Sequence, residues 1–313
     1  MPDIKNDPIL ADDGCVYMTQ EEILAFAKMG APTEFDRSGV KNCHMDIQYG
    51  TLPEQILDLY LPETGDGPFP TMVYVHGGGW SMGTKTEGFL GGAIGLLEKG
   101  YAVISINYRL VPKTRFPEFI FDAKTAVRWA RAHAAEYKLD PSRFAMAGDS
   151  AGGHIALMMG FTAGRPEYAG EQYGWPGFSD GLQAICDMYG PSILDEPMVT
   201  FYRESGVPRV RREESSQSQA FVNTFGTDNT DLLRLISPIA LVHKDIPPIL
   251  ILHGRLDAVV PYQHSTLLAD KIKDVCGEDR VELIIYEDRN HSDYGFNTKE
   301  NSDIIAEFLA RHL

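Results

Sequence analysis

The sequence contains few cysteines, and no two of them form a C-x-x-C pair. Without such a pair, the chain offers no local support for a zinc site or a redox site. Cysteines this sparse and scattered are typical of a reducing compartment, so we expect a cytoplasmic protein in which each cysteine is a small buried hydrophobe. The four are Cys15, Cys43, Cys186 and Cys276.

Long apolar runs are also missing, since none approaches the roughly 20 residues that a helix needs to span a bilayer. The first 14 residues carry acids early and have no apolar core, which does not fit a secretory signal. The presence of Met1 argues against a signal that has been trimmed. We therefore expect a protein without a membrane partner.

Basic residues are scarce, because 28 Lys and Arg stand against 44 Asp and Glu and leave a net charge of −16. This charge would repel a phosphate backbone or an anionic membrane surface, so no nucleic-acid partner is expected either. The expected partner is a small molecule. The composition leaves the oligomeric state open, and a homodimer is compatible with it.

What the chain does contain is an alternation of short apolar runs and helical patterns over its 313 residues. Runs that are apolar on both faces are typical of buried parallel strands. Strands that alternate with helices predict an α/β protein with a mostly parallel sheet and helices on both of its faces. The expected strands are 71–76, 101–108, 143–149, 183–190, 247–254 and 281–287, and the expected helices are 118–137, 151–164, 262–276 and 298–313.

Segments 44–50 and 55–62 alternate polar and apolar residues around a short turn, which predicts an antiparallel hairpin at the sheet edge. Residues 1–43 and about 191–236 do not fit the alternation. Long irregular insertions in compact domains are usually functional or mobile, so we predict a small cap over one sheet face, with a surface excursion as the alternative. The catalytic domain would then span residues 44–313. The aromatic residues of the insertion, which could line a pocket or fill the core of the cap, are Phe201, Tyr202, Phe221 and Phe225.

The strongest local motif is G-x-S-x-G at residues 148–152, where a strand pattern ends and a helical pattern begins. This context predicts a sharp turn that exposes the hydroxyl of Ser150 at the C-terminal edge of the sheet. The flanking glycines allow backbone segments to approach without a Cβ clash, and the helix from Ala151 aims its positive end at the site. We therefore predict Ser150 as a nucleophile, with a passive serine in a glycine-rich turn as the alternative.

A second motif, His-Gly-Gly-Gly-Trp at residues 76–80, also follows a strand pattern. Consecutive glycines present bare N–H groups, which predicts an oxyanion hole made by Gly78 and Gly79 together with the N–H of Ala151. A phosphate-binding loop is the alternative, but the G-x-x-x-x-G-K-[ST] pattern is absent. We expect His76 to hold this loop by hydrogen bonding, and Trp80 either to border the acyl site or to pack in the core.

A serine hydroxyl needs a base that is held by a third group. His291 follows the last predicted strand and a short loop, so it can reach Ser150, and it is the predicted base. Asp257 lies in the loop after the strand at 247–254 and is the predicted acid, because residues at that edge of the sheet meet. The other histidines after the serine are His154, His243, His253, His264 and His312, and the other acids near His291 are Glu287, Asp288 and Asp293.

Taken together, the motifs at 76–80, 107–110, 148–153 and 253–261, with His291, resemble the hormone-sensitive-lipase-like branch of the α/β-hydrolase esterases. Within it, the sequence is similar to the bacterial feruloyl and acetyl esterases, over roughly residues 44–313. The resemblance implies the α/β-hydrolase fold, hydrolysis of short-chain carboxylic esters without a cofactor or metal, and a supporting role for Asp149 in the turn. The family commonly has glycine beside the histidine, whereas this chain has Asn290 and Ser292.

The expected function is carboxylic ester hydrolysis through an acyl-enzyme, on acetyl-type or feruloyl esters. Three alternatives stay open: an arylformamidase-like amidase on the same scaffold, a peptidase of related fold, and a binding protein that kept the fold without catalysis.

Overall fold

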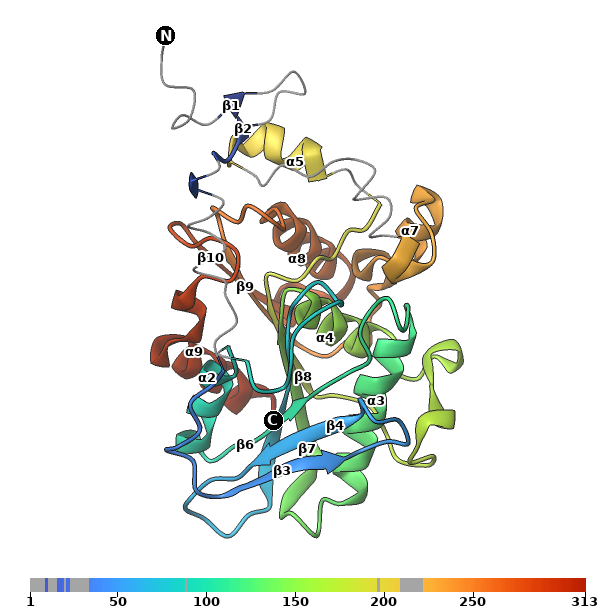
Figure 1. Cartoon of the computed structure of the whole chain (residues 1–313), viewed down its shortest axis with the longest axis vertical. Helices are drawn as coiled ribbons and strands as arrows, with labels where there is room; N and C mark the ends of the chain where they lie inside the picture. Colours follow the sequence, from blue (N-terminus) through green and yellow to red (C-terminus); the bar gives the residue numbers. More distant parts are fainter. Residues whose placement is uncertain are drawn as a thin grey trace.

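The computed structural model describes residues 9–10, 16–19, 21–22, 34–87, 89–195, 198–208 and 222–313. Its centre is an eight-stranded sheet in the order β10-β9-β8-β7-β5-β6-β4-β3 (Figure 1). β3 and β4 form the predicted antiparallel hairpin at the edge, β4 is also antiparallel to β6, and the other neighbours are parallel. All six runs predicted as strands are strands of this sheet. The strands are β3 (Cys43–Gln48), β4 (Ile56–Tyr60), β5 (Phe69–Val75), β6 (Ala102–Ile106), β7 (Leu139–Asp149), β8 (Ala184–Met188), β9 (Ile249–Gly254) and β10 (Val281–Tyr286).

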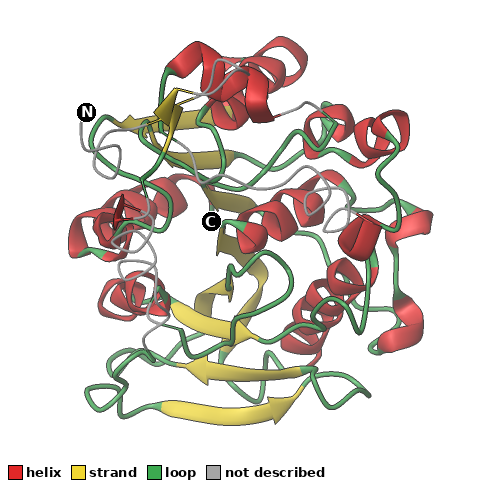
Figure 2. Ribbon diagram, turned by 45° about the horizontal axis from the view of Figure 1, so that its top comes forward, coloured by secondary structure: helices red, strands yellow, loops and turns green. Residues whose placement is uncertain are grey.

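Helices cover both faces of the sheet, as predicted (Figure 2). One hydrophobic core packs α3 (Glu118–Ala132), α4 (Ala151–Phe161) and α8 (Gln263–Cys276) against the first face. The second core packs α2 (Leu90–Ile94), η1 (Gly95–Lys99) and α9 (Lys299–His312) against the other. In the part of the chain described, none of the helices combines the length and apolar character needed to cross a membrane.

The helical segment α2–η1 was not predicted, because Gly91, Gly92 and Gly95 make this stretch a poor helix former. Its packing explains why glycine is used. A Cβ on Gly92 would lie 3.1 Å from the Asn297 side chain, and one on Gly95 would lie 2.5 Å from the Ser302 hydroxyl. Close approach to Asn297 and to Ser302 on α9 therefore stabilises a helix that local propensity alone would not.

The insertion at 191–236 contains α5 (Met198–Ser205) and α7 (Thr230–Ile236), before the short η4 (Pro238–Leu241). Leu194, Phe225 and Leu233 form a small hydrophobic cluster that packs on Trp80 and Phe116. The backbone of α5 accepts a hydrogen bond from the first residue of α8, through the Phe201 carbonyl. The insertion thus packs against loops at the C-terminal edge of the sheet.

The N-terminal segment contains a two-stranded antiparallel sheet, β1 (Ile9–Leu10) and β2 (Val16–Tyr17). Further along, Glu34 forms an antiparallel bridge with Glu87, and the N–H of Phe35 donates to the carbonyl of Thr86. The N-terminal segment is therefore tied to the loop that follows β5. Most of the amphipathic stretch expected at 20–30 lies outside the described residues.

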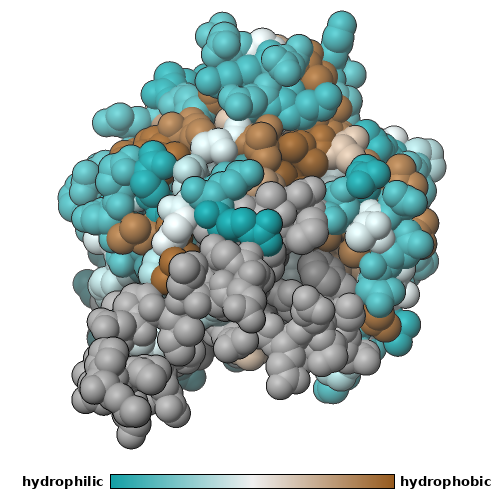
Figure 3. Space-filling view, turned by 90° about the horizontal axis from the view of Figure 1, so that it is seen from above, coloured by the Kyte–Doolittle hydropathy of each residue, from teal (hydrophilic) through white to brown (hydrophobic). Residues whose placement is uncertain are grey.

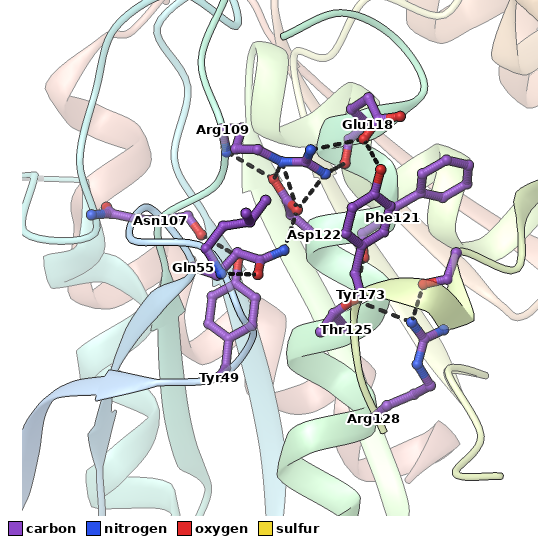
Figure 4. A network of polar contacts seen from close by, with 12 residues as sticks. Tyr49, Gln55, Asn107, Arg109, Glu118, Phe121, Asp122, Thr125, Arg128 and Tyr173 are labelled. Carbon is purple, nitrogen blue, oxygen red and sulfur yellow. Dashed lines mark hydrogen bonds and ion pairs between the residues drawn. The ribbon is translucent and has the colours of Figure 1, made fainter. Parts of the chain in front are cut away.

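A polar network joins the edge hairpin to α3 (Figure 4). The Arg109 guanidinium donates to both carboxylate oxygens of Asp122, at N–O distances of 2.9–3.1 Å. The side-chain amide of Gln55, just before β4, donates to the same carboxylate at 2.7 Å. Glu118 pairs with Arg109 at 2.8 Å and accepts from the Tyr173 hydroxyl at 2.5 Å. The network therefore connects the hairpin, the loop after β6, α3 and η3 (Glu171–Tyr173).

Candidate active site

Ser150 lies in the sharp turn between β7 and α4, as the motif predicted. Its backbone has φ 51° and ψ −117°, a conformation that L-residues adopt rarely and that costs about 1–3 kcal/mol. A strained serine that interrupts a strand-to-helix connection projects its side chain away from both elements. The turn therefore presents the hydroxyl beyond the C-terminal edge of the sheet.

The glycines around Ser150 are required by close backbone contacts. A Cβ on Gly152 would lie 2.0 Å from the carbonyl oxygen of Val75, and one on Gly148 would lie 2.3 Å from the carbonyl carbon of Gly152. Side chains cannot occupy such spaces without moving the backbone. The strain at the serine is thus held by tight packing of the turn against β5.

The three residues predicted as nucleophile, base and acid lie in one line of hydrogen bonds. The Ser150 hydroxyl is 3.0 Å from Nε2 of His291, and Nδ1 of His291 is 2.7 Å from Oδ2 of Asp257. They come from three different loops, after β7, β9 and β10. The arrangement can move a proton from the serine to the imidazole while the carboxylate stabilises the resulting positive charge.

Asp257 is 1% exposed and its carboxylate is fully hydrogen-bonded. Oδ1 accepts from the N–H groups of Val259 and Val260 at 2.8 and 2.7 Å, while Oδ2 faces His291 and His253. Burial would raise the pKa of Asp257, but the charges and hydrogen bonds of the two imidazoles outweigh it and hold the pKa well below its usual range. The group is therefore a carboxylate at any ordinary pH.

Asn290, directly before His291, links the loop of the predicted base to that of the predicted acid. Its Oδ1 accepts from the N–H of His291 at 2.7 Å and from the N–H of Ala258 at 3.0 Å. The carbonyl of Arg289 accepts from the N–H of Leu256 at 3.1 Å. These bonds position the histidine loop against the Asp257 loop.

The glycine loop after β5 is tied to the serine turn by a buried carboxylate. Oδ1 of Asp149 accepts from the Tyr74 hydroxyl at 2.6 Å and from the N–H of Gly77 at 3.1 Å. Burial raises the pKa of Asp149 although these bonds oppose the shift. Gly78 and Gly79 follow with φ values of 97° and 57°, a region that favours glycine.

Two stacked rings support the same loop. The imidazole of His76 stacks on Tyr108 with 4.4 Å between ring centroids, and its Nδ1 donates to the Gly77 carbonyl at 2.8 Å. Burial lowers the pKa of His76 to about 4, so the ring is neutral and does not carry charge to the site. Among the described residues, no protein group accepts from the N–H of Gly78 or Gly79. Ala151 is the first residue of α4, where an N–H has no partner within the helix.

Of the other five histidines that follow Ser150 in the chain, four lie away from the hydrogen-bonded line and one lies beside it. His154 and His264 are fully buried on α4 and α8, His243 precedes β9, and His312 ends α9. His253, near the end of the strand predicted at 247–254, lies with Nε2 3.2 Å from Oδ2 of Asp257. The signal that could have found it is the four-residue spacing across the tight turn from His253 to Asp257, which brings both side chains to one place.

Aromatic rings form a wall beside the glycine loop. Trp80 lies edge-on to Phe225 and to His154, each with 5.2 Å between centroids, and Phe116 lies 5.9 Å from Phe225. Of the other aromatic residues predicted for the cap, Phe201 is buried against His264, while Phe221 and the side chain of Tyr202 lie outside the description.

Exposed hydrophobic side chains follow the C-terminal ends of three strands. Met82 after β5 is 63% exposed, Leu256 after β9 is 43% exposed and Tyr294 after β10 is 70% exposed. Viewed from the top of Figure 1, hydrophobic surface gathers near the middle of the molecule (Figure 3).

Within the described ranges, no group of three or more His, Cys, Asp or Glu side chains could hold a metal ion.

Comparison with known families gives a match to the BD-FAE family, whose sequence model covers residues 57–272. The matched region runs from β4 into α8 and contains Ser150 and Asp257, while His291 lies beyond it. More than half of the chain is therefore aligned to one family.

Similar proteins include two curated esterases. The chain is 30% identical over 231 residues to the esterase LipC of Mycobacterium tuberculosis, which covers 73% of this chain and 55% of LipC. It is 28% identical over 254 residues to the isoprenylcysteine alpha-carbonyl methylesterase ICME of Arabidopsis thaliana, which covers 81% of this chain and 57% of ICME. The chain thus spans about half the length of the curated relatives it matches.

Among solved structures, the chain is similar to a truncated carbohydrate esterase from gut microbiota. The TM-score is 0.77 at 25% identity, over 90% of this chain and 99% of the other. This likeness confirms the α/β-hydrolase fold that the motifs implied.

Proposed function

The chain belongs to the BD-FAE family of α/β-hydrolase proteins, and from this premise we propose that it is a carboxylic ester hydrolase. The observation that carries the proposal is the continuous hydrogen-bonded line from Ser150 through His291 to Asp257. Relatives named as esterases support the reaction class. The catalytic roles are those that the spacing of the motifs indicated.

In the proposed mechanism, Ser150 attacks the ester carbonyl carbon while its hydroxyl proton passes to Nε2 of His291. The carbonyl oxygen becomes an oxyanion, which the N–H groups of Gly78, Gly79 and Ala151 stabilise. The C–O bond to the alcohol then breaks, and the alcohol leaves with the proton from the histidine. Water attacks the acyl-enzyme through the same base, which releases the acid and restores the serine.

The proposed substrates are neutral esters with short acyl groups of the acetyl type, or feruloyl esters. The wall of Trp80, Phe116 and Phe225 beside the glycine loop supports an apolar acyl site. The similar structure is described as a carbohydrate esterase, which makes acylated sugars a first choice for testing. We also propose that residues 1–43 and 191–236 form a cap. Contacts of both segments with loops at the C-terminal sheet edge support this.

The sparse cysteines support a cytoplasmic location, and the net charge of −16 supports a small-molecule partner over nucleic acid or a membrane.

The proposal is tested by the hydrolysis of p-nitrophenyl acetate by the wild type and by Ser150→Ala. We expect the alanine variant to lose nearly all activity while its circular dichroism spectrum is unchanged. Ser142→Ala is the matched control, because Ser142 is exposed near the other end of β7 and should not affect the rate. Full activity in Ser150→Ala would refute the assignment.

A substrate panel then separates the remaining alternatives. It contains acetylated sugars, feruloylated sugars, esters of increasing acyl length and N-formylkynurenine. Faster turnover of the formamide than of every ester would identify an arylformamidase-like amidase. Absence of turnover and absence of labelling by an organophosphate probe would indicate a binding protein that lacks catalysis.

A further inference from the structure

His253 is a buried histidine that the mechanism above does not use. It is the penultimate residue of β9 and is completely inaccessible to solvent. Its Nε2 lies 3.2 Å from Oδ2 of Asp257 and 2.9 Å from the carbonyl oxygen of Val260. Its Nδ1 lies 2.6 Å from the hydroxyl of Ser265 on α8. Both ring nitrogens therefore have partners, which a buried polar side chain needs.

These contacts determine where the ring carries its proton. A carboxylate and a carbonyl oxygen only accept hydrogen bonds, so Nε2 of His253 must be protonated and must donate. Nδ1 faces a hydroxyl, which donates to it when the ring is neutral. The two acceptors at Nε2 thus fix the tautomer of the imidazole and Ser265 fixes its orientation, so that the imidazole presents an N–H to Asp257 and to the Val260 carbonyl.

Oδ2 of Asp257 consequently faces two imidazoles: Nδ1 of His291 donates to it at 2.7 Å, and Nε2 of His253 lies 3.2 Å away, with its N–H shared between Oδ2 and the Val260 carbonyl. The two imidazoles beside Oδ2 and the two backbone donors on Oδ1 hold the carboxylate in one orientation. The same carboxylate charge is also shared between two rings. A carboxylate that is shared in this way stabilises a protonated His291 less than an unshared one would.

The groups that face His253 come from three elements. Tyr189, directly after β8, lies with its ring centroid 6.4 Å away, and Asp187 on β8 interacts electrostatically with His253, although burial raises the pKa of Asp187 to about 7. From α8, Ser265 and His264 face the ring, and burial keeps His264 neutral by lowering its pKa to about 3. From the loop after β9 comes Asp257, the carboxylate that the Nε2 proton reaches.

We propose that His253 is a positioning residue for the catalytic acid: it holds Asp257 through Oδ2, is itself oriented by Ser265, and shares the Asp257 carboxylate with His291. The inference deepens the proposed function and rests on it. A line of polar contacts then extends from Ser265 through His253, Asp257 and His291 to Ser150, with one serine–histidine pair on each side of the carboxylate. A residue that only filled space at this position would need neither nitrogen.

The test compares His253→Leu, which removes the donor, with His253→Gln, whose amide N–H can replace Nε2–H. For His253→Leu we expect kcat for p-nitrophenyl acetate to fall about 10- to 100-fold with KM nearly unchanged, because the acid loses its alignment. The acidic limb of the kcat/KM profile should move to higher pH, because an unshared carboxylate stabilises a positive charge on the neighbouring imidazole more strongly. His253→Gln should recover most of the rate and return the limb toward that of the wild type.

A structural role alone would give a different result. Loss of packing lowers the folded fraction and leaves the acidic limb where it is in the wild type. An unmoved limb in His253→Leu, or a wild-type kcat, would overturn the inference. His133→Leu is the matched control, because His133 stacks on Trp129 at the end of α3 and has no contact with the line of residues from Ser265 to Ser150.

Ser265→Ala and Ser265→Thr provide a second pair if His253→Leu does not fold. The alanine variant should lower kcat severalfold and the threonine variant, which keeps the hydroxyl, should not. Equal rates in both would contradict the orienting role. NMR titration of the His291 ring separates the two hypotheses, because it needs no substrate. Inactivity of the wild type toward all esters would refute the proposed function, whereas an unchanged His291 titration in His253→Leu would refute only this inference.

Discussion

At the scale of single residues, Asp257 makes the most contacts in the hydrogen-bonded line that ends at Ser150. Its carboxylate accepts two backbone hydrogen bonds and faces two imidazoles. In Asp257→Asn, an amide N–H would oppose Nδ1–H of His291 or force the other tautomer on the ring. We expect kcat to fall by about 10³- to 10⁴-fold, as for a triad whose acid becomes an amide. Ester hydrolysis by the folded variant measures this effect.

The control for that variant is Asp288→Asn, an exposed acid in the loop before His291. It should keep the rate of the wild type. If Asp257→Asn hydrolysed esters at the wild-type rate, another acid would have to serve His291.

Asp187 gives a prediction about pH and stability. Burial raises the pKa of its carboxyl to about 7, although the charge of His253 opposes the shift. The folded protein therefore holds this proton more tightly than the unfolded chain, whose aspartates have a pKa near 3.9. Stability from this group is complete below about pH 4 and is lost as the pH rises toward 7.

Asp187→Asn removes that loss, because an amide does not ionise. The difference in melting temperature, variant minus wild type, should increase between pH 4 and pH 7 and then stay level. Thermal denaturation at pH 4.5, 6 and 8 checks this. A difference that is constant with pH would contradict the shifted pKa.

At the scale of elements, the network around Arg109 connects the edge hairpin to α3 (Figure 4). Asp122 is fully buried and the Arg109 side chain is 14% exposed. Among the described residues, Arg109→Met would leave that buried carboxylate with the Gln55 amide and one backbone N–H as donors. Loss of one partner of a buried pair costs about 3–5 kcal/mol, so we expect the free energy of unfolding to fall by that amount.

Urea denaturation of Arg109→Met provides the measurement. Lys113→Met is the control, because Lys113 pairs with Glu54 at 3.8 Å while its own side chain is 82% exposed. Exposed ion pairs contribute little, so this variant should unfold at the same urea concentration as the wild type. Equal effects of the two substitutions would show that the network is not a structural connection.

Phe225 tests the contribution of the insertion to acyl selection. Its ring packs on Trp80 beside the glycine loop. Phe225→Ala opens space at the proposed acyl site, and a change of this size in an apolar pocket alters discrimination about tenfold or more. We expect the kcat/KM for p-nitrophenyl butyrate to rise relative to that for the acetate.

Phe178→Ala, which alters an exposed ring, should leave the butyrate-to-acetate ratio unchanged. An unchanged ratio in Phe225→Ala would place the acyl site elsewhere.

The strands and long helices were predictable because their apolar periodicity agrees with their final environment. All six predicted central strands and four helices lie where the sequence indicated. The segment α2–η1 was not predictable from the sequence, because its stability comes from glycines that let it approach Asn297 and Ser302. Such a contact joins residues about 200 positions apart in the chain, so a local sequence pattern does not predict it.

At the scale of the whole molecule, chain order and topology were enough to bring Ser150, Asp257 and His291 together in the prediction. Parallel strands place the loops that follow them at one edge, so three loops from β7, β9 and β10 converge. The sequence does not indicate which other side chains contact these three residues where the loops meet. The roles of His253 and Asn290 depend on contacts between the loops after β9 and β10, which no local pattern indicates.

The central claim is that Ser150 forms the acyl-enzyme with the help of His291. The most direct measurement is incubation with a fluorophosphonate probe, followed by intact mass and peptide mapping of the wild type, Ser150→Ala and His291→Ala. We predict one adduct per chain, located on Ser150, absent in the alanine variant of the serine and formed at least about 100-fold more slowly without the base. An adduct on another residue, or equal labelling of Ser150→Ala, would contradict the account.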